Sequence, residues 1–257
     1  MILELITREK LEYTARKILG YSMQDAEKDY FLALVMQIIS NSELGKLLVF
    51  KGGTSIYHCY LEQLRFSEDL DFTSLDKNIS LGSFSGLFNN QEIFEIKKEY
   101  ESYATIKIER LKYNGILEMP NSLKIEVDKF QNVYLPSIEK YYKNNWELTF
   151  KVNVMDPVEI CAEKIRAAND RFRYRDFYDL YMLVNKYGID LSESIKIISK
   201  KEIRKPISKF NIVRNLNYTF EGKKDRVDVI IYKEEISNEK MKAFIEDLNI
   251  PDFNINV

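Results

Sequence analysis

The sequence is poor in the residues that mark disulfide-stabilised and zinc-binding proteins. Of 257 residues only two are cysteine and one is histidine. Cys59 and Cys161 lie far apart in no metal-ligand spacing, which argues against a disulfide framework and favours a reducing cytosol. A mechanism that depends on histidine is disfavoured, because His58 would have to supply it alone.

Long apolar runs and an excess of either charge are also missing. No stretch of about 18 uncharged apolar residues exists, so we expect no membrane-spanning helix. The start, MILELITREKLEY, lacks the features of a signal peptide, and we expect a cytoplasmic protein. The net charge of −2 means that any nucleic-acid contact must use a local basic patch. The 45% apolar content suffices for a sizeable core in one or two domains.

The spacing of apolar residues changes along the chain and predicts two halves. Residues 1–46 have a helical pattern, and strands are predicted at 47–51, 67–73, 103–113, 123–130 and 150–154. Asp156, Pro157 and Glu159 then predict a capped helix start, with helices over 156–170 and 175–187 and one strand-like run at 227–232. We predict a mixed α/β domain over residues 1–155 and a mostly helical domain over residues 156–257.

Two glycines follow the first predicted strand. Gly52 and Gly53 would let backbone approach a phosphate, at the start of a helix predicted over 55–64. Thr54 and Ser55 add hydroxyl donors beside them. The plainer interpretation is a tight strand-to-helix turn with no ligand.

Two aspartates lie on the next predicted strand. Residues two apart on a strand point to the same face, so Asp69 and Asp71 present adjacent carboxylates, with Ser67 on the same side. Adjacent like charges repel unless a cation lies between them, and Mg²⁺ prefers carboxylate and phosphate oxygens. A solvated strand face is the alternative. A third carboxylate could come from Glu126 or Asp128, and the sequence does not decide which one lies level with the pair.

Together the glycines, the helix and the acids form the layout needed to bind a nucleoside triphosphate beside a metal. The stretch FKGGTSIYHCYLEQLRFSEDLDF resembles the AbiEii/AbiGii family of type IV toxins, which includes the MenT toxins, within the nucleotidyltransferase superfamily. Two later motifs are similar as well: K-x-x-A-x-x-x-R at Lys164 to Arg171, and D-x-x-D at Asp176 and Asp179. The resemblance covers about residues 47–185.

The resemblance implies a fold and a reaction. The fold is a polymerase-β-like mixed sheet with flanking helices, followed by a mostly helical half that completes the active site. The reaction transfers a nucleoside monophosphate from an NTP to RNA, for MenT members the 3′ end of tRNA. An antitoxin partner and a role in abortive infection, a phage defence, are implied too. An NTP-binding (GTP-binding) toxin or regulator without transfer, and a catalytically inert partner-binding module, stay open as alternatives.

Site residues follow from the motifs and the resemblance together. The residues expected to hold Mg²⁺ or Mn²⁺ are Asp69, Asp71 and Glu126. Those expected to bind the nucleotide are Gly52, Gly53, Thr54, Ser55, Ser67, Lys164 and Arg171. Those expected to be catalytic are Asp69, Asp71, Lys164, Asp176 and Asp179. The two later aspartates could act as a base, or could hold the lysine or an arginine in place.

Two basic stretches are candidates for contact with RNA. RFRYR, residues 171–175, alternates cations with aromatics, as in surfaces that grip phosphates and stack bases. Its alternative is an inter-helix turn with both aromatics packed inward. Residues 196–214 contain seven lysines and arginines against one glutamate, which suggests a tRNA-facing patch or a solvated helix face.

Overall fold

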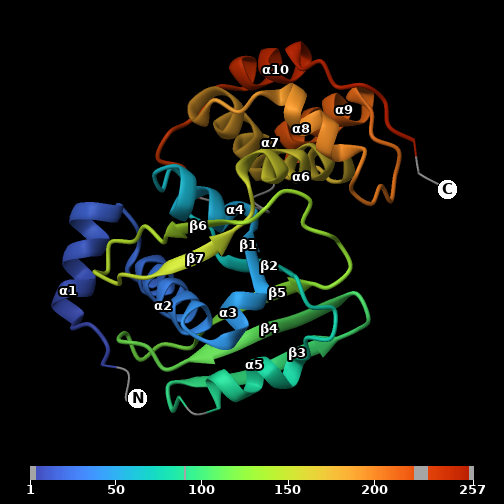
Figure 1. Ribbon diagram of the computed structural model, residues 1–257. Coiled ribbons are helices and arrows are strands. Elements are labelled where there is room, and N and C mark those ends of the chain that lie inside the picture. The colour runs from blue at the N-terminus through green and yellow to red at the C-terminus, as the bar shows by residue number, and fades with distance from the viewer. Residues whose placement is uncertain (1–3, 90, 223–230, 255–257) are drawn as a thin grey trace. The chain divides into compact units, whose positions relative to one another are not determined.

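The computed structural model describes residues 4–89, 91–222 and 231–254 (Figure 1). The chain divides into two compact units. The first comprises Met1–Cys59, Ser67–Val133 and Ser137–Val154, and the second comprises Tyr60–Phe66, Tyr134–Pro136 and Met155–Val257. Within the described residues, no helix has the length and apolar character needed to cross a bilayer.

The first unit is built on a mixed sheet of seven strands in the order β3-β4-β5-β2-β1-β7-β6. The strands are β1 (Leu48–Lys51), β2 (Asp69–Ser74), β3 (Phe94–Glu101), β4 (Thr105–Tyr113), β5 (Asn121–Asp128), β6 (Ile138–Tyr141) and β7 (Lys151–Val154). Two neighbouring pairs, β2 with β5 and β1 with β7, are parallel, and the others are antiparallel. The five strands predicted from the sequence are all present in this sheet.

Helices cover the sheet of the first unit. They are α1 (Arg8–Tyr13), the π-helical η1 (Thr14–Leu19), α2 (Met23–Ser40), α3 (Glu43–Leu47), α4 (Gly52–Ser55), the π-helical η2 (Ile56–Tyr60) and α5 (Leu81–Phe88). Helix α2 contacts β2, β5 and β7 (Figure 1), and its Phe31, Leu32 and Val35 are fully buried. The helix predicted at 55–64 begins earlier, at Gly52, and ends at Tyr60.

Three elements of the first unit were not predicted. Strands β3 and β6 form the two edges of the sheet, and β3 is mostly exposed and rich in charge, so neither shows an alternating apolar face. Helix α5 contains two glycines and two serines, which are weak helix formers, and it depends on the buried Phe84 and Phe88.

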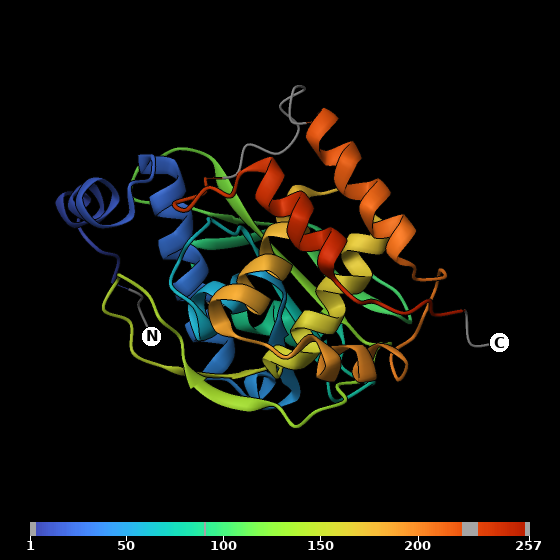
Figure 2. The same ribbon diagram turned by 90° about the horizontal axis from the view of Figure 1, so that it is seen from above.

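The second unit is helical: α6 (Pro157–Asp170), α7 (Tyr174–Tyr181), the π-helical η3 (Met182–Tyr187), α8 (Leu191–Ile198), α9 (Lys209–Gly222) and α10 (Asn238–Asp247). Helix α6 contacts α7, α8 and α9, and α10 lies beside α9 (Figure 2). Asp156 caps α6 by accepting a hydrogen bond from Val158 N at 2.9 Å, and Gly188, at φ +87°, ends η3. Both predicted helix boundaries are therefore confirmed. Of the predicted strand at 227–232, residues 227–230 lie outside the described part of the chain.

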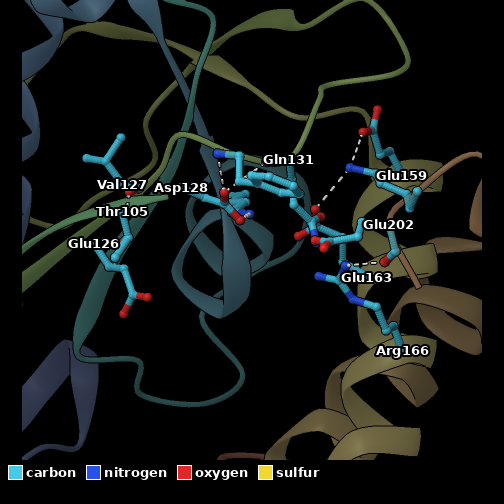
Figure 3. A network of polar contacts seen from close by, with 12 residues as sticks. Thr105, Glu126, Val127, Asp128, Gln131, Glu159, Glu163, Arg166 and Glu202 are labelled. Carbon is cyan, nitrogen blue, oxygen red and sulfur yellow. Dashed lines mark hydrogen bonds and ion pairs between the residues drawn. The ribbon is translucent and has the colours of Figure 1, made fainter. Parts of the chain in front are cut away.

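Glu159 does not complete a capping box, contrary to the expectation from its spacing. Its buried carboxylate instead accepts hydrogen bonds from the backbone N–H groups of Tyr134 and Leu135, at 2.8–3.0 Å, and pairs with Lys201. Lys201 also contacts Glu163 at 3.0 Å. Figure 3 shows Glu159 and Glu163 on α6. A carboxylate that could have capped its own helix thus holds the short segment Tyr134–Pro136 in the second unit.

Candidate active site

The turn between β1 and α4 requires glycine and is built against an aspartate. Gly52 has φ +79°, a conformation that L-residues rarely adopt, and a Cβ atom there would lie 2.7 Å from Asp71 Oδ2. Strands β1 and β2 are antiparallel, with Lys51 opposite Asp71. The glycine turn and the aspartate pair therefore belong to one place in the first unit.

Two hydroxyls after the glycines fasten this turn. Thr54 Oγ1 lies 2.5 Å from the Asp69 carbonyl oxygen and 2.9 Å from Ser67 Oγ. The Ser55 hydroxyl donates to Gly52 O at 2.8 Å, and Thr54 and Ser55 are both fully buried. These hydroxyls are engaged within the protein, so the half-exposed backbone of the glycines is the part of the turn best placed to meet a phosphate.

The sheet register identifies the acid that lies level with Asp71. Strands β2 and β5 run parallel, with Asp71 opposite Glu126 and Thr73 opposite Asp128. Asp128 is used locally, because its Oδ1 accepts hydrogen bonds from the N–H groups of Phe130 and Gln131 (Figure 3). The register thus places Glu126, and not Asp128, opposite the aspartate pair.

The carboxylates of β2 and β5 repel one another. Burial raises the pKa of Asp71 to about 6, and the charges of Asp69 and Glu126 add to the increase, while Lys51 and Lys124 oppose it. Glu126 is bridged by Lys107 at 3.0 Å and Lys124 at 3.1 Å. Burial alone would raise its pKa, but these lysines outweigh that effect and lower it.

The donor set suits a divalent ion that arrives with a nucleotide. Among the described residues, no three acidic, histidine or cysteine side chains are arranged to hold a metal ion. Mg²⁺, however, is usually bound by one or two carboxylates together with substrate phosphates. Asp69 and Asp71 can supply that pair. A contribution from Glu126, which two lysines now hold, stays a prediction.

The second unit contains a chain of alternating charges around Lys164. Lys164 Nζ lies 2.7 Å from Asp179 Oδ2 and 3.1 Å from Asp176 Oδ1. Arg171 donates hydrogen bonds from Nε and Nη2 to the Asp176 carboxylate, at 2.7 and 3.0 Å. Arg65 donates hydrogen bonds from Nε and Nη2 to the Asp179 carboxylate, both at 2.7 Å. The two motifs, at residues 164–171 and 176–179, therefore meet in a single ion-pair network.

Both aspartates of this network are held in the ionised form. Burial alone would raise the pKa of Asp176, but the charges of Lys164 and Arg171 outweigh it and hold the pKa far below its usual range. Asp179 is fully buried, and Arg65 and Lys164 likewise lower its pKa. A general base needs a pKa near the working pH. This arrangement therefore favours holding the lysine over accepting a proton.

Arg65 was missed by the sequence reasoning. It lies four residues before Asp69, in a stretch without helical or strand periodicity, and nothing in the spacing pairs it with α7. Its nearness to the aspartate motif was the only available signal. Arg65 is 2% exposed and belongs to the segment Tyr60–Phe66 of the second unit.

The two basic stretches, residues 171–175 and 196–214, are partly occupied by packing and by ion pairs. In RFRYR, Phe172 is 65% exposed, whereas Tyr174 is buried and its hydroxyl donates to Ile236 O at 3.2 Å. One aromatic therefore points outward and one inward. In residues 196–214, Lys196, Lys201 and Arg204 form ion pairs with glutamates.

Comparison with known proteins assigns the family. The family model described as "Nucleotidyl transferase AbiEii toxin, Type IV TA system" matches residues 33–253, which include all the motifs above. The chain belongs to the AbiEii family of nucleotidyltransferase toxins. An AbiEii assignment explains why the glycine turn, the aspartate pair, the lysine helix and the second aspartate pair occur together in this order.

Solved structures are similar to this AbiEii chain in fold. MenT4, a nucleotidyltransferase toxin from Mycobacterium tuberculosis H37Rv, is similar with TM-score 0.67 and 18% identity over 93% of this chain and 90% of its own. A candidate nucleotidyltransferase from H. pylori is similar with TM-score 0.56 and 17% identity, over 87% and 92% of the two chains. The predicted fold class, a nucleotidyltransferase-type mixed sheet with flanking helices and a mostly helical second half, is confirmed.

A sequence relative extends the likeness without adding a function. An uncharacterized protein from Aquifex aeolicus, aq_aa25, is 27% identical over 201 residues, which is 76% of this chain and 87% of the relative. The family assignment therefore rests on the family model, with the solved structures in agreement on the fold.

Proposed function

We propose that this AbiEii protein transfers a nucleoside monophosphate from an NTP to an RNA acceptor. An acceptor hydroxyl oxygen attacks the α-phosphorus and releases its proton to water. The bond from the α-phosphorus to the oxygen that bridges it to the β-phosphate breaks, and pyrophosphate leaves with that electron pair. The observation that carries the proposal is the close approach of Asp71 to the glycine turn, where a Cβ atom on Gly52 would lie 2.7 Å from Asp71 Oδ2, so the turn and the carboxylate pair lie together. Mg²⁺ or Mn²⁺, held by Asp69 and Asp71, would neutralise phosphate charge and polarise the reacting phosphate.

The protein residues have distinct roles in this proposal. Backbone N–H groups of Gly52 and Gly53 bind phosphate oxygens, with Thr54, Ser55 and Ser67 fixing the turn. Lys164 neutralises triphosphate charge. Asp176 and Asp179 orient Lys164, and Arg171 supports Asp176.

In this proposal residues 156–257 complete the active site, through Lys164 and the two aspartates that hold it. The family match supports that role, because it covers residues 33–253 and so includes both the glycine and aspartate motifs and the Lys164 motif.

An exposed aromatic cluster on the second unit supports RNA as the acceptor. Phe210 is 73% exposed on α9, and the Arg214 guanidinium lies 5.8 Å from its ring centroid. Tyr218, one helical turn beyond Arg214, contacts Phe172 with ring centroids 6.1 Å apart. Exposed rings interleaved with arginine are suited to stacking unpaired bases beside phosphates, as at a single-stranded RNA end such as that of tRNA.

A labelling experiment tests the reaction. The protein is incubated with each α-³²P-labelled NTP, Mg²⁺ and total RNA, beside Asp71→Asn and the surface control Asp247→Asn. We expect labelled RNA from the parent and from the control only. NTP retained without labelled RNA would favour an NTP-binding toxin or regulator, and neither result would leave an inert module that works by binding its antitoxin or another partner.

A further inference from the structure

Arg65 is a buried arginine that the proposed chemistry does not yet use. Its guanidinium presents two parallel N–H donors to Asp179, and Nη1 donates to its neighbouring backbone at Phe66 O, 3.0 Å away. Only a guanidinium supplies this planar fork, and a lysine ammonium cannot reproduce it. Arg65 is therefore held both by the Asp179 carboxylate and by the Phe66 carbonyl.

Arg65 belongs to an ion-pair network that is shared among several residues. Arg65 and Lys164 both contact Asp179, and Lys164 and Arg171 both contact Asp176. The Arg65 side chain is 2% exposed and that of Arg171 is 46% exposed, so solvent screens the charge of Arg65 less.

Burial of this ion pair is by itself weak evidence for a purely structural role. Buried ion pairs often contribute little net stability, because desolvation of both charges offsets their attraction. The fork does have a geometric consequence, since it binds both oxygens of Asp179 while Asp179 Oδ2 also contacts Lys164 Nζ at 2.7 Å. The position of the Asp179 carboxylate, and with it that of Lys164, depends on Arg65.

We infer that Arg65 is a positioning residue for nucleotide transfer, which acts through Asp179 to orient Lys164 toward the NTP phosphates. The inference rests on the proposed function and adds to it a residue in the segment just before the aspartate pair. Arg65 acts on Lys164 from one end of the network, and Arg171 acts from the other.

A double-mutant cycle tests this inference in the full-length protein. Arg65→Gln, Arg65→Lys, Asp179→Asn and the double variant Arg65→Gln/Asp179→Asn are compared for kcat and for KM of the transferred NTP. Arg16→Gln is the matched control, because Arg16 is a surface arginine that pairs with Glu12. Thermal unfolding of each variant confirms that the folded protein is being assayed.

The expected results separate positioning from folding. Arg65→Gln should lower kcat/KM by about 100-fold, through a higher KM and a lower kcat, since loss of charge and misplacement of Lys164 both act. Arg65→Lys keeps the charge and loses the fork, so it should mainly lower kcat, and it also serves if Arg65→Gln does not fold. The double variant should be no less active than Asp179→Asn, because residues that act through one another are not additive.

Other outcomes would overturn the inference. If Arg65→Gln melts at a lower temperature but keeps parental kcat/KM, Arg65 serves the fold only. If the losses of the two single variants multiply in the double variant, Arg65 does not act through Asp179. A parent that labels no RNA with any NTP would refute the proposed function itself, and the inference with it, whereas an active parent with a fully active Arg65→Gln variant refutes the inference alone.

Discussion

The Gly52→Ala variant should show separately how this position affects the free energy of unfolding and how it affects transfer activity. At φ +79° an L-residue is disfavoured by about 1–2 kcal/mol, which is the expected loss of unfolding free energy. The added Cβ would also lie 2.7 Å from Asp71 Oδ2 and 3.2 Å from Asp71 Cβ, so the aspartate must shift. Displacement of a reacting group by about 1 Å can cost about 100-fold in rate. We expect Gly52→Ala to fold and to lose transfer activity by about that factor.

Gly20→Ala is a matched control in the same unit. Gly20 has φ +70°, and a Cβ atom there meets nothing within 4 Å. It should lose a similar unfolding free energy in urea denaturation and keep the parental rate of NTP-to-RNA labelling. If both variants lose activity equally, or if Gly52→Ala keeps the rate of Gly20→Ala, the claim that the glycine turn positions Asp71 is wrong.

Three further predictions concern the acids and the aromatic cluster. The folded state raises the pKa of Asp71 to about 6, above its value of about 4 in an unfolded chain. The folded state therefore binds the proton more tightly, and the free energy of unfolding of the parent should fall as pH rises from 4 to 6. Asp71→Asn should be inactive in the labelling experiment. In metal-free urea denaturation it should therefore be more stable than the parent at pH 7, with no gain at pH 4; a less stable variant at pH 7 would contradict this. Glu159→Gln should cost about 3 kcal/mol, because it removes one carboxylate partner of the buried Lys201, and should speed hydrogen exchange at the Tyr134 amide; unchanged exchange would refute the role of Glu159 in holding that segment. Phe172→Ala and Tyr218→Ala should each weaken RNA binding by about 1–3 kcal/mol without changing NTP affinity, and filter binding that shows parental affinity for RNA would remove the cluster from the acceptor surface.

Local chemistry was sufficient to predict most elements. The cap at Asp156 and the stop at Gly188 depend on hydrogen bonds and backbone conformations within a few residues, so the sequence predicts them directly. The alternation of β2 correctly places Asp69 and Asp71 on one face. Edge strands were missed, because a strand without a fully buried face lacks the alternation of apolar and polar residues that indicates a strand.

By itself the sequence determined the family, the order of its motifs and the local elements that have a clear apolar period or cap, because each of these signals depends on residues close in the chain. Only the tertiary structure decided which acid faces Asp71, since a period of two fixes the face of a strand but not its register against a distant neighbour. The same holds for Arg65 and Asp179, which are separated by 114 positions. Their ion pair is formed by packing of the Tyr60–Phe66 segment with α7 in one unit, and no local pattern carries that information.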